Sequence, residues 1–203
     1  MSDDAPLIVG LGGTMTADSS SERVLRHVLR TCEAAGARTL CFDGQALDMP
    51  MYGFGTPRTE KVAAMIDGLR RADGIIITSP GYHGTVSGLI KNALDYVEDM
   101  AKDERPYFEG RAVGLITVAA GWQATGTTLA TLRSIVHALR GWPTPMAVTV
   151  NSRMPVLAED GTVCDAALGN QLDTLASQVV GFARMRALDD LSRAAAAAET
   201  QEG

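Results

Sequence analysis

Residues 75–97 read IIITSPGYHGTVSGLIKNALDYV, and this stretch decides the fold. It begins with a β-branched apolar run, Ile75 to Thr78, which is typical of a strand buried on both faces. It ends with apolar residues at helical spacing, namely Val86, Leu89, Ile90, Ala93, Leu94 and Val97. A buried strand followed at once by an amphipathic helix is the repeating unit of a parallel α/β sheet.

The same alternation of strand and helix extends along the chain in both directions. Further apolar runs predict strands over residues 7–10, 39–42, 113–118 and 146–150. Apolar residues at helical spacing predict helices over residues 24–32, 62–69, 129–139 and 168–179. Five strands alternating with five helices predict a single α/β domain over residues 1–203, with a parallel sheet covered on both faces.

Two segments fall outside this alternation. Residues 152–162 show no regular pattern and are compatible with a surface loop, a short extra hairpin or an interface element. The alanine run from Ala194 to Ala198 can extend a helix, but the last residues are polar. We expect the core to span about residues 6–187 and the tail beyond it to fray.

Composition excludes several classes of protein. The chain has 203 residues, of which 46% are hydrophobic, so it can bury a core and is not disordered. The net charge of −6 argues against a nucleic-acid partner and against a polybasic membrane anchor. No signal peptide and no apolar run of membrane-spanning length are visible, so we expect a cytoplasmic protein.

The cysteines Cys32, Cys41 and Cys164 are odd in number and lack C-x-x-C spacing. This pattern gives neither a zinc site nor a complete disulfide framework. We therefore expect reduced thiols in the core and no bound metal.

Residues 10–22 read GLGGTMTADSSSE and join the first predicted strand to the first helix. Ligands of an open parallel sheet bind beyond the carboxyl ends of its strands, where this loop lies. Glycines free backbone amides, and threonine and serine hydroxyls add donors ahead of the positive end of a helix, which is what a phosphate group needs. Ser19 and Glu22 also fit a capping box, which is the purely structural interpretation of that pair.

A dinucleotide-binding fingerprint is the competing interpretation of this loop. Gly10-x-Gly12 begins the G-x-G-x-x-G pattern, and Asp43 follows the second predicted strand, where a ribose-binding acid would lie. Met15 takes the place of the third glycine, and the helix begins too late. The hydroxyl-rich loop therefore suits a terminal monophosphate better than a pyrophosphate.

The segment SPGYHGTVSGLIKNALDY, residues 79–96, resembles the second flavin-binding segment of the NAD(P)H-dependent FMN reductases. That family's pattern is S-P-E-Y-H/N-G-S-x-P-G-x-L-K-N-A-L-D-W, which is matched by Ser79, Pro80, Tyr82, His83, Gly84, Gly88, Lys91, Asn92, Ala93, Leu94 and Asp95. The family's phosphate loop, G-S-L-R-x-x-S-x-N, aligns with residues 13–21. The resemblance extends from Leu7 to about Met185.

The resemblance implies a flavodoxin-like three-layer sandwich with strand order 2-1-3-4-5 and FMN as cofactor. It also implies an oxidoreductase that moves hydride from NADPH or NADH to the flavin and on to a small acceptor, such as free flavin, a quinone or an azo compound. The phosphate contacts that it implies are Gly13, Thr14, Thr16, Ser19, Ser20 and Ser21. The implied ring contacts are Pro80, Gly81, Tyr82, His83, Gly84, Ala120, Gly121 and Trp122. We expect no side-chain acid or base, because the cofactors carry the chemistry.

Two residues depart from the family pattern. Thr16 replaces the arginine of the phosphate loop, so one cationic contact is lost and FMN can be either tightly bound or a dissociable substrate. Gly81 replaces the acidic residue of S-P-E-Y, which we expect to leave more room or more backbone freedom beside the isoalloxazine ring.

Two ring-lining residues have more than one interpretation. We interpret His83 as a residue that shapes its loop rather than as a catalyst. Trp122 is compatible with stacking on flavin or nicotinamide, with a subunit contact, or with ordinary core packing.

Two other functions remain open from the sequence. One is a flavodoxin-like electron carrier without its own NAD(P)H site, although the T-x-T-G-x-T loop of such carriers is only half matched by residues 14–19. The other is a family member specialised for one small-molecule redox step.

The resemblance also implies a homodimer or homotetramer with the flavin near a subunit boundary, as is common in the family. Tyr96 and Met100 widen the apolar stripe of the third predicted helix. Trp142, Pro143 and Pro145 add apolar surface without an obvious use within the chain.

Overall fold

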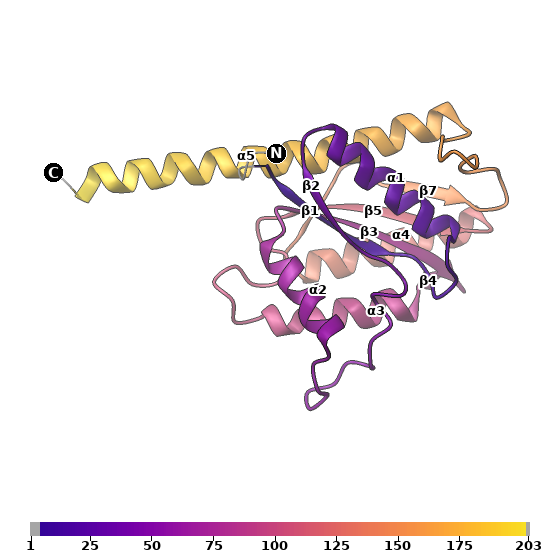
Figure 1. The fold of residues 1–203 in the computed structure, drawn as a ribbon, viewed down its shortest axis with the longest axis horizontal. Helices are drawn as coiled ribbons and strands as arrows, with labels where there is room; N and C mark the ends of the chain where they lie inside the picture. The colour runs from indigo at the N-terminus through magenta and orange to yellow at the C-terminus, as the bar shows by residue number, and fades with distance from the viewer. Residues whose placement is uncertain (1–4, 202–203) are drawn as a thin grey trace.

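The computed structural model describes residues 5–201 and contains a twisted parallel sheet between two layers of helices (Figure 1). The strands β1 (Leu7–Gly12), β2 (Arg38–Phe42), β3 (Gly74–Tyr82) and β5 (Ala112–Ala119) lie in the order β2-β1-β3-β5. Two short strands, β6 (Trp142–Pro143) and β7 (Val148–Asn151), each pair in parallel with β5. The predicted order 2-1-3-4-5 is confirmed, with the fifth position divided between β6 and β7. A two-residue strand, β4 (Thr85–Val86), pairs with β3 in antiparallel direction and was not predicted.

The helices cover the two faces of the sheet in unequal numbers. Helices α1 (Ser20–Ala34) and α5 (Ala166–Gln201) cover one face, on a core that includes Ile8 and Ile76. Helices α2 (Glu60–Arg71), α3 (Gly88–Asp95) and α4 (Trp122–Ala138) cover the other, on a core that includes Val9, Ile75 and Ile77. Successive strand residues point to opposite faces, so both faces must be apolar, as the sequence indicates.

Several boundaries differ from the predicted ones. Helix α4 begins at Trp122, although its apolar spacing starts only at Leu129. Threonines occupy its first turns and form hydrogen bonds with the helix backbone. Thr125 Oγ1, for example, donates to the carbonyl of Trp122 at 2.8 Å. After α3 the chain tightens into a 3₁₀ turn over Tyr96–Met100. The sequence pattern fails at these places because propensity and capping, rather than burial, set the helix ends.

In the structure α5 continues through the tail beyond residue 187 and ends at Gln201. Figure 1 shows the C-terminal half of this helix extending away from the sheet. Alanine has the highest helix propensity, and Arg186 adds ion pairs to Asp189 and Asp190 at 3.0 and 2.9 Å. Residues 202 and 203 lie outside the described part of the chain.

The segment between β7 and α5 is a compact hairpin-like turn. Leu157 and Val163 form an isolated antiparallel bridge, and Val156 and Leu157 are buried. Arg23 of α1 donates hydrogen bonds to the carbonyls of Leu157 and Ala158, at 3.0 and 2.7 Å. Of the three possibilities left open by the sequence, the structure supports the short hairpin.

The cysteines only partly follow expectation. Cys32 lies on the buried face of α1, and burial raises the pKa of its thiol to about 12. Cys41 and Cys164 are exposed, so the prediction of core thiols is wrong for these two. No helix in the described range 5–201 combines the length and the apolarity needed to cross a bilayer.

Gly81 lies where the end of β3 packs against α4. A Cβ atom there would lie 2.8 Å from Thr128 Oγ1 and 3.2 Å from both the Ala119 Cβ and the Ala124 carbonyl oxygen. The expectation that Gly81 leaves extra room is therefore wrong, because helix α4 fills the space that an acidic side chain would need.

Replacing Gly81 by Ala should destabilise the protein by about 1–3 kcal/mol, the usual cost of overpacking. Gly126 is the matched control, because it lies on the exposed side of α4 with no atom within 4 Å of its added Cβ. Gly126→Ala should stabilise the protein by up to about 1 kcal/mol through helix propensity. Urea unfolding of both variants measures the difference, and equal shifts would contradict the close approach of α4.

Candidate functional site

Three predicted segments meet at one edge of the sheet. Residues 13–21, 80–84 and 120–122 follow or end the strands β1, β3 and β5. These strands are neighbours in parallel register, with Gly12 beside Thr78 and Pro80 beside Val118, so their carboxyl ends lie together. The structure therefore brings together every site residue that the sequence predicts, in the place where open α/β sheets bind ligands.

The loop after β1 presents unused backbone donors. The amides of Met15, Ala17, Ser19, Ser20 and Ser21 donate to no acceptor within residues 5–201. Gly13, with φ of 102°, adopts a backbone conformation that favours glycine and turns the chain into the loop. Free amides ahead of a helix N-terminus bind anions well.

Side chains hold this loop in shape. The Ser19 hydroxyl accepts from the Glu22 amide at 3.3 Å, which confirms Ser19 as the cap of α1. The reciprocal bond of a capping box is shifted by one residue, because Glu22 Oε2 accepts from the Asp18 amide, at 3.1 Å, and not from that of Ser19. The Thr14 hydroxyl exchanges hydrogen bonds with the backbone of Thr16. The Ser19 and Ser21 hydroxyls lie 3.2 Å apart. Two hydroxyls and several amides thus converge on one small region.

Two of the arginines that line a cavity beside Asp18, Arg23 and Arg26, already have partners within the protein. Arg23 binds the carbonyls of Leu157 and Ala158, and Arg26 pairs with Glu22 and Asp43 at 2.5 and 3.3 Å. The donor set is therefore amide and hydroxyl groups at the positive end of α1, which fits a phosphate monoester without a cationic clamp.

Gly44 is a site residue that sequence reasoning missed. A Cβ atom on Gly44 would overlap the carbonyl group of Thr14. The turn after β2 can therefore contact the phosphate loop only because residue 44 is glycine. Asp43 caps the same turn, with Oδ1 accepting from the amides of Gln45 and Ala46 at 3.1 Å each. This structural use leaves the dinucleotide interpretation of Asp43 without support. The Asp-Gly pair after the second strand was the signal that could have identified this turn.

The segment after β3 is a tight hairpin turn. Tyr82 pairs with Thr85, and the two residues between them, His83 and Gly84, have φ of 52° and 83°. Positive φ at both central positions defines a type I′ geometry, which matches the twist of the two strands. The backbone of His83 agrees with its interpretation as a loop-shaping residue. Ser79 fixes the base of the hairpin, because its hydroxyl accepts from the Ser87 amide at 3.2 Å.

The segment after β5 leads directly into α4. Gly121 is the N-cap, and Trp122 is the first helical residue, with 59% of its surface exposed. Core packing, one of the three interpretations of Trp122, is therefore wrong. Tyr82 and Met15 are similarly exposed, at 54% and 50%, so each of the three segments presents one large apolar side chain. A flat aromatic ring can cover such a surface.

The matched helix residues serve structure. Lys91 and Asp95 form an ion pair at 2.6 Å on the surface of α3. Asn92 accepts from the Tyr52 amide at 2.8 Å and donates to the Pro50 carbonyl at 2.9 Å, so it fastens the loop before α2 to α3.

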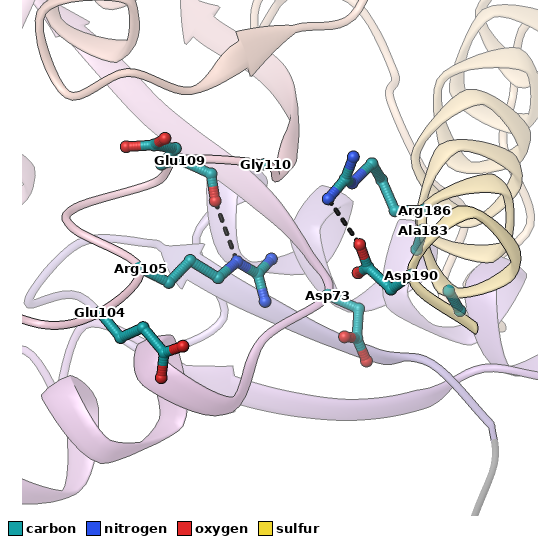
Figure 2. Close-up of a pocket in the computed structure, with 9 residues that line it drawn as sticks. Asp73, Glu104, Arg105, Glu109, Gly110, Ala183, Arg186 and Asp190 are labelled. Atoms are coloured by element: carbon teal, nitrogen blue, oxygen red, sulfur yellow. Dashed lines mark hydrogen bonds and ion pairs between the residues drawn. The ribbon is translucent and has the colours of Figure 1, made fainter. Parts of the chain in front are cut away.

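A charged pocket at the opposite edge of the sheet is separate from this site. Figure 2 shows Asp73, Arg105, Glu109, Arg186 and Asp190 around a cavity of about 210 Å³. Arginines and carboxylates neutralise one another there: Arg186 pairs with Asp190 at 2.9 Å, for example. None of the predicted site residues lines this pocket.

Comparisons with known proteins agree with this geometry. The sequence profile of the NADPH-dependent FMN reductases matches residues 6–154. The FMN-dependent NADPH-azoreductase of Staphylococcus aureus is 29% identical over 156 residues, which cover 74% of this chain and 79% of the relative.

Solved structures share the fold. The flavoenzyme NAD(P)H:acceptor oxidoreductase FerB of Paracoccus denitrificans superposes with a TM-score of 0.73 at 18% identity, over 90% of this chain and 99% of that one. A flavodoxin, WrbA-like protein of Agrobacterium tumefaciens gives a TM-score of 0.64 at 17% identity, over 90% and 99% of the two chains. The profile match covers most of the chain, including the loop after β1 and the hairpin after β3. The chain therefore belongs to the NADPH-dependent FMN reductase family and is an FMN-dependent NAD(P)H oxidoreductase with a flavodoxin-like fold.

Proposed function

We propose that FMN binds with its phosphate on residues 13–21 and its isoalloxazine ring between residues 80–84 and 120–122, and that the enzyme reduces a small acceptor. The observation that carries this proposal is the set of free amides after β1, at the N-terminus of α1. When bound, FMN supplies the chemistry of accepting two electrons from NAD(P)H and passing them on.

The residues of the chain bind and orient in this proposal. Amides of the loop and the hydroxyls of Ser19 and Ser21 hold the phosphate. The exposed rings of Tyr82 and Trp122 flank the flavin, and the rigid turn at His83-Gly84 presents backbone amides to it. Fixed amide dipoles aimed at the ring stabilise negative charge on it without reorganisation. No side-chain acid or base is assigned.

We also propose a homodimer or homotetramer with the flavin near a subunit boundary. The supporting observation is the apolar surface of the loop before α2, where Met51 and Phe54 are 75% and 88% exposed and which Asn92 fastens to α3. Large exposed apolar groups near a site often mark an interface. A cytoplasmic location is supported by the free thiols of Cys41 and Cys164, which suit a reducing compartment.

Anaerobic mixing with NADH and with NADPH tests the proposed activity. Rapid bleaching of the flavin absorbance by either nucleotide, followed by reoxidation on adding a small acceptor, is the expected result. A protein that binds FMN but is not reduced by either nucleotide would instead be an electron carrier.

Replacing Ser19 and Ser21 together by Ala should weaken FMN binding by at least tenfold. Each lost hydrogen bond to a charged group is worth roughly 1.5–3 kcal/mol. Riboflavin, which lacks the phosphate, should bind equally well to both proteins. Fluorescence titration of the apoprotein with each flavin measures the difference.

Thr59→Ala is the matched control for this double substitution. Thr59 caps α2 as Ser19 caps α1, accepting from the Val62 amide at 3.4 Å, but it lies outside the phosphate loop. Its loss should cost about 1 kcal/mol of stability and leave FMN affinity unchanged. Equal weakening of FMN and riboflavin by the serine substitutions would place the phosphate elsewhere.

Replacing Gly44 by Ala should reduce FMN binding more than tenfold, because the new methyl group displaces the Thr14 carbonyl and with it the phosphate loop. Gly55→Ala is the control, since the Cβ atom at Gly55 meets nothing within 4 Å. Flavin content of the purified variants and a titration with FMN provide the measurement. Retention of full FMN affinity in the Gly44 variant would show that the loop can move without cost.

Light scattering at micromolar concentration tests the proposed assembly. The expected mass is two or four times the 21.4 kDa of one chain. Phe54→Ser should shift the mass toward that of the monomer and lower flavin content in parallel. An active, flavin-loaded protein with the mass of a single chain would refute both the assembly and the shared site.

A further inference from the structure

The C-terminal half of α5 extends away from the body of the protein (Figure 1). This half begins after Ala183, the last residue of α5 in the core, and it lies beyond the matched residues 6–154. From residue 184 to residue 198 the side chains are exposed, except for the half-buried Arg186 and Asp189. A helix in a protein gains most of its stability from packing an apolar face, and this half packs on little of its own chain.

One side of this helix half is apolar. Leu188, Leu191, Ala195 and Ala198 are spaced three, four and three residues apart, which places them on one face of an α-helix. Both leucines and both alanines are exposed. We call these four residues the α5 stripe.

The charged residues on the other side of this helix half pair with one another. Arg186 pairs with Asp189 and Asp190 at 3.0 and 2.9 Å, and Figure 2 shows the second of these pairs. Arg193 pairs with Asp189 at 3.0 Å. The α5 stripe itself therefore offers an apolar, uncharged surface, which fits another apolar helix rather than a nucleic acid or a charged peptide.

The α5 stripe borders an open groove. Leu188 and Leu191 line the groove from the helix, and Ala5, Pro6 and Arg38 line it from the start of β1 and β2. Its volume is about 750 Å³. The leucines thus face a space that is wide enough to admit side chains of a second molecule.

We propose that the α5 stripe binds the α5 stripe of a second copy of this chain in antiparallel orientation. Leu188 and Leu191 of one copy then lie against Ala198 and Ala195 of the other. The interface goes beyond the proposed function and uses no residue of the flavin site.

The order of side chains along the stripe favours this orientation. The leucines lie at the base of the projecting half, and the alanines lie toward its tip. Antiparallel contact sets a large side chain against a small one along the whole seam, so the two helices pack without a gap. Parallel contact would set leucine against leucine and leave the alanines apart. A two-fold interface needs a surface that is complementary to itself, and this stripe meets that requirement only when antiparallel.

Charge favours the same orientation. Arg38 and Arg184 line the groove, and within residues 5–201 they donate to the backbone carbonyls of Ala5 and Ala35 and form no ion pair. Residues 199–203 read ETQEG, with two acidic residues and no basic one, and the C-terminal end of a helix carries partial negative charge. Antiparallel contact brings that end of the other copy's α5 toward the two arginines.

The two carboxylates that line the groove have partners within their own chain. Asp73 Oδ2 accepts from the Leu7 amide at 2.8 Å, and Asp190 pairs with Arg186. They therefore leave the groove arginines available to the other copy.

Light scattering of two matched variants tests the interface. Ala195→Arg places a charge in the α5 stripe and should halve the mass measured at micromolar concentration. Ala197→Arg changes the same alanine run on the side of the ion pairs and should leave the mass unchanged. Both positions are exposed and arginine is a good helix former, so both variants should fold. Equal masses of the Ala195 variant and the wild type would overturn the inference.

Disulfide cross-linking tests the orientation. Leu188→Cys and Ala198→Cys are each made with Cys41 and Cys164 replaced by Ser, because those two thiols are exposed. Mixing the two variants under oxidising conditions should give at least tenfold more cross-linked pairs than either variant alone. In the antiparallel pair the two copies of residue 188 lie about 15 Å apart along the helix axis, and a disulfide needs Cα atoms within about 7 Å. Efficient cross-linking of either variant alone, or none in the mixture, would overturn the antiparallel pairing.

Arg38→Glu tests the charge contact. It should raise the dissociation constant of the pair at least fivefold, with a smaller effect at high salt. Arg153→Glu makes the same change of charge at an exposed arginine outside the groove and should leave the constant unchanged. Sedimentation of a dilution series provides the measurement, and equal weakening by both substitutions would contradict the contact between the groove and the end of α5.

The Phe54→Ser variant separates this interface from the one proposed at the loop before α2. If only Ala195→Arg halves the mass, the helix interface stands and the loop interface fails. If only Phe54→Ser does so, the helix interface fails. Flavin content and anaerobic reduction by NADPH are measured on the same samples, and the Ala195 variant should match the wild type in both.

Discussion

The parallel register of β1, β3 and β5 is the constraint on which the rest of the structure depends. These strands lie at the centre of the sheet and are buried on both faces, so their side chains are apolar in both directions. Parallel strands end at a common edge, and each must be followed by a connection that starts there. Three loops that are far apart in the sequence thereby become neighbours, and the strands hold them rigidly.

Close backbone approach is the second requirement at this edge. Gly44 lets the turn after β2 touch the phosphate loop, and Gly81 lets α4 pack against the end of β3. At Gly84 the requirement is conformational, since φ of 83° is the left-handed region that favours glycine. Together these glycines let backbone segments from β2, β3 and α4 approach closely at this edge.

The functional edge of the sheet can be followed strand by strand. The loop after β1 offers phosphate donors, and the hairpin after β3 and the turn after β5 border the proposed ring site. A cavity at the ends of β5 and β7 is lined by residues that include Trp122, Asn151 and Met154. The hairpin-like segment after β7 supplies Met154 to this cavity and is itself held by Arg23 of α1. Helix α1 thus begins at the proposed phosphate site and also fastens the segment after β7.

The sequence by itself indicated the alternating strands and helices and the two-sided core, and its resemblance to the family implied the strand order and the proposed site segments. The apolar run from Ile75 to Thr78 and the matched segment from Ser79 to Asp95 are patterns among neighbouring residues. Such patterns can be recognised in the sequence without knowledge of the fold. The sequence did not predict the start of α4 at Trp122 or the length of α5. Capping determines the first of these helix ends and alanine propensity the second, and neither produces an apolar spacing. Only the tertiary structure decided what each residue meets: that Gly81 faces α4 rather than open space, that Gly44 lies against Thr14, and that Trp122 is exposed. Those contacts join segments that are distant in the chain. Their distances depend on how the helices pack on the sheet, and the residue spacing within one segment carries no information about that packing.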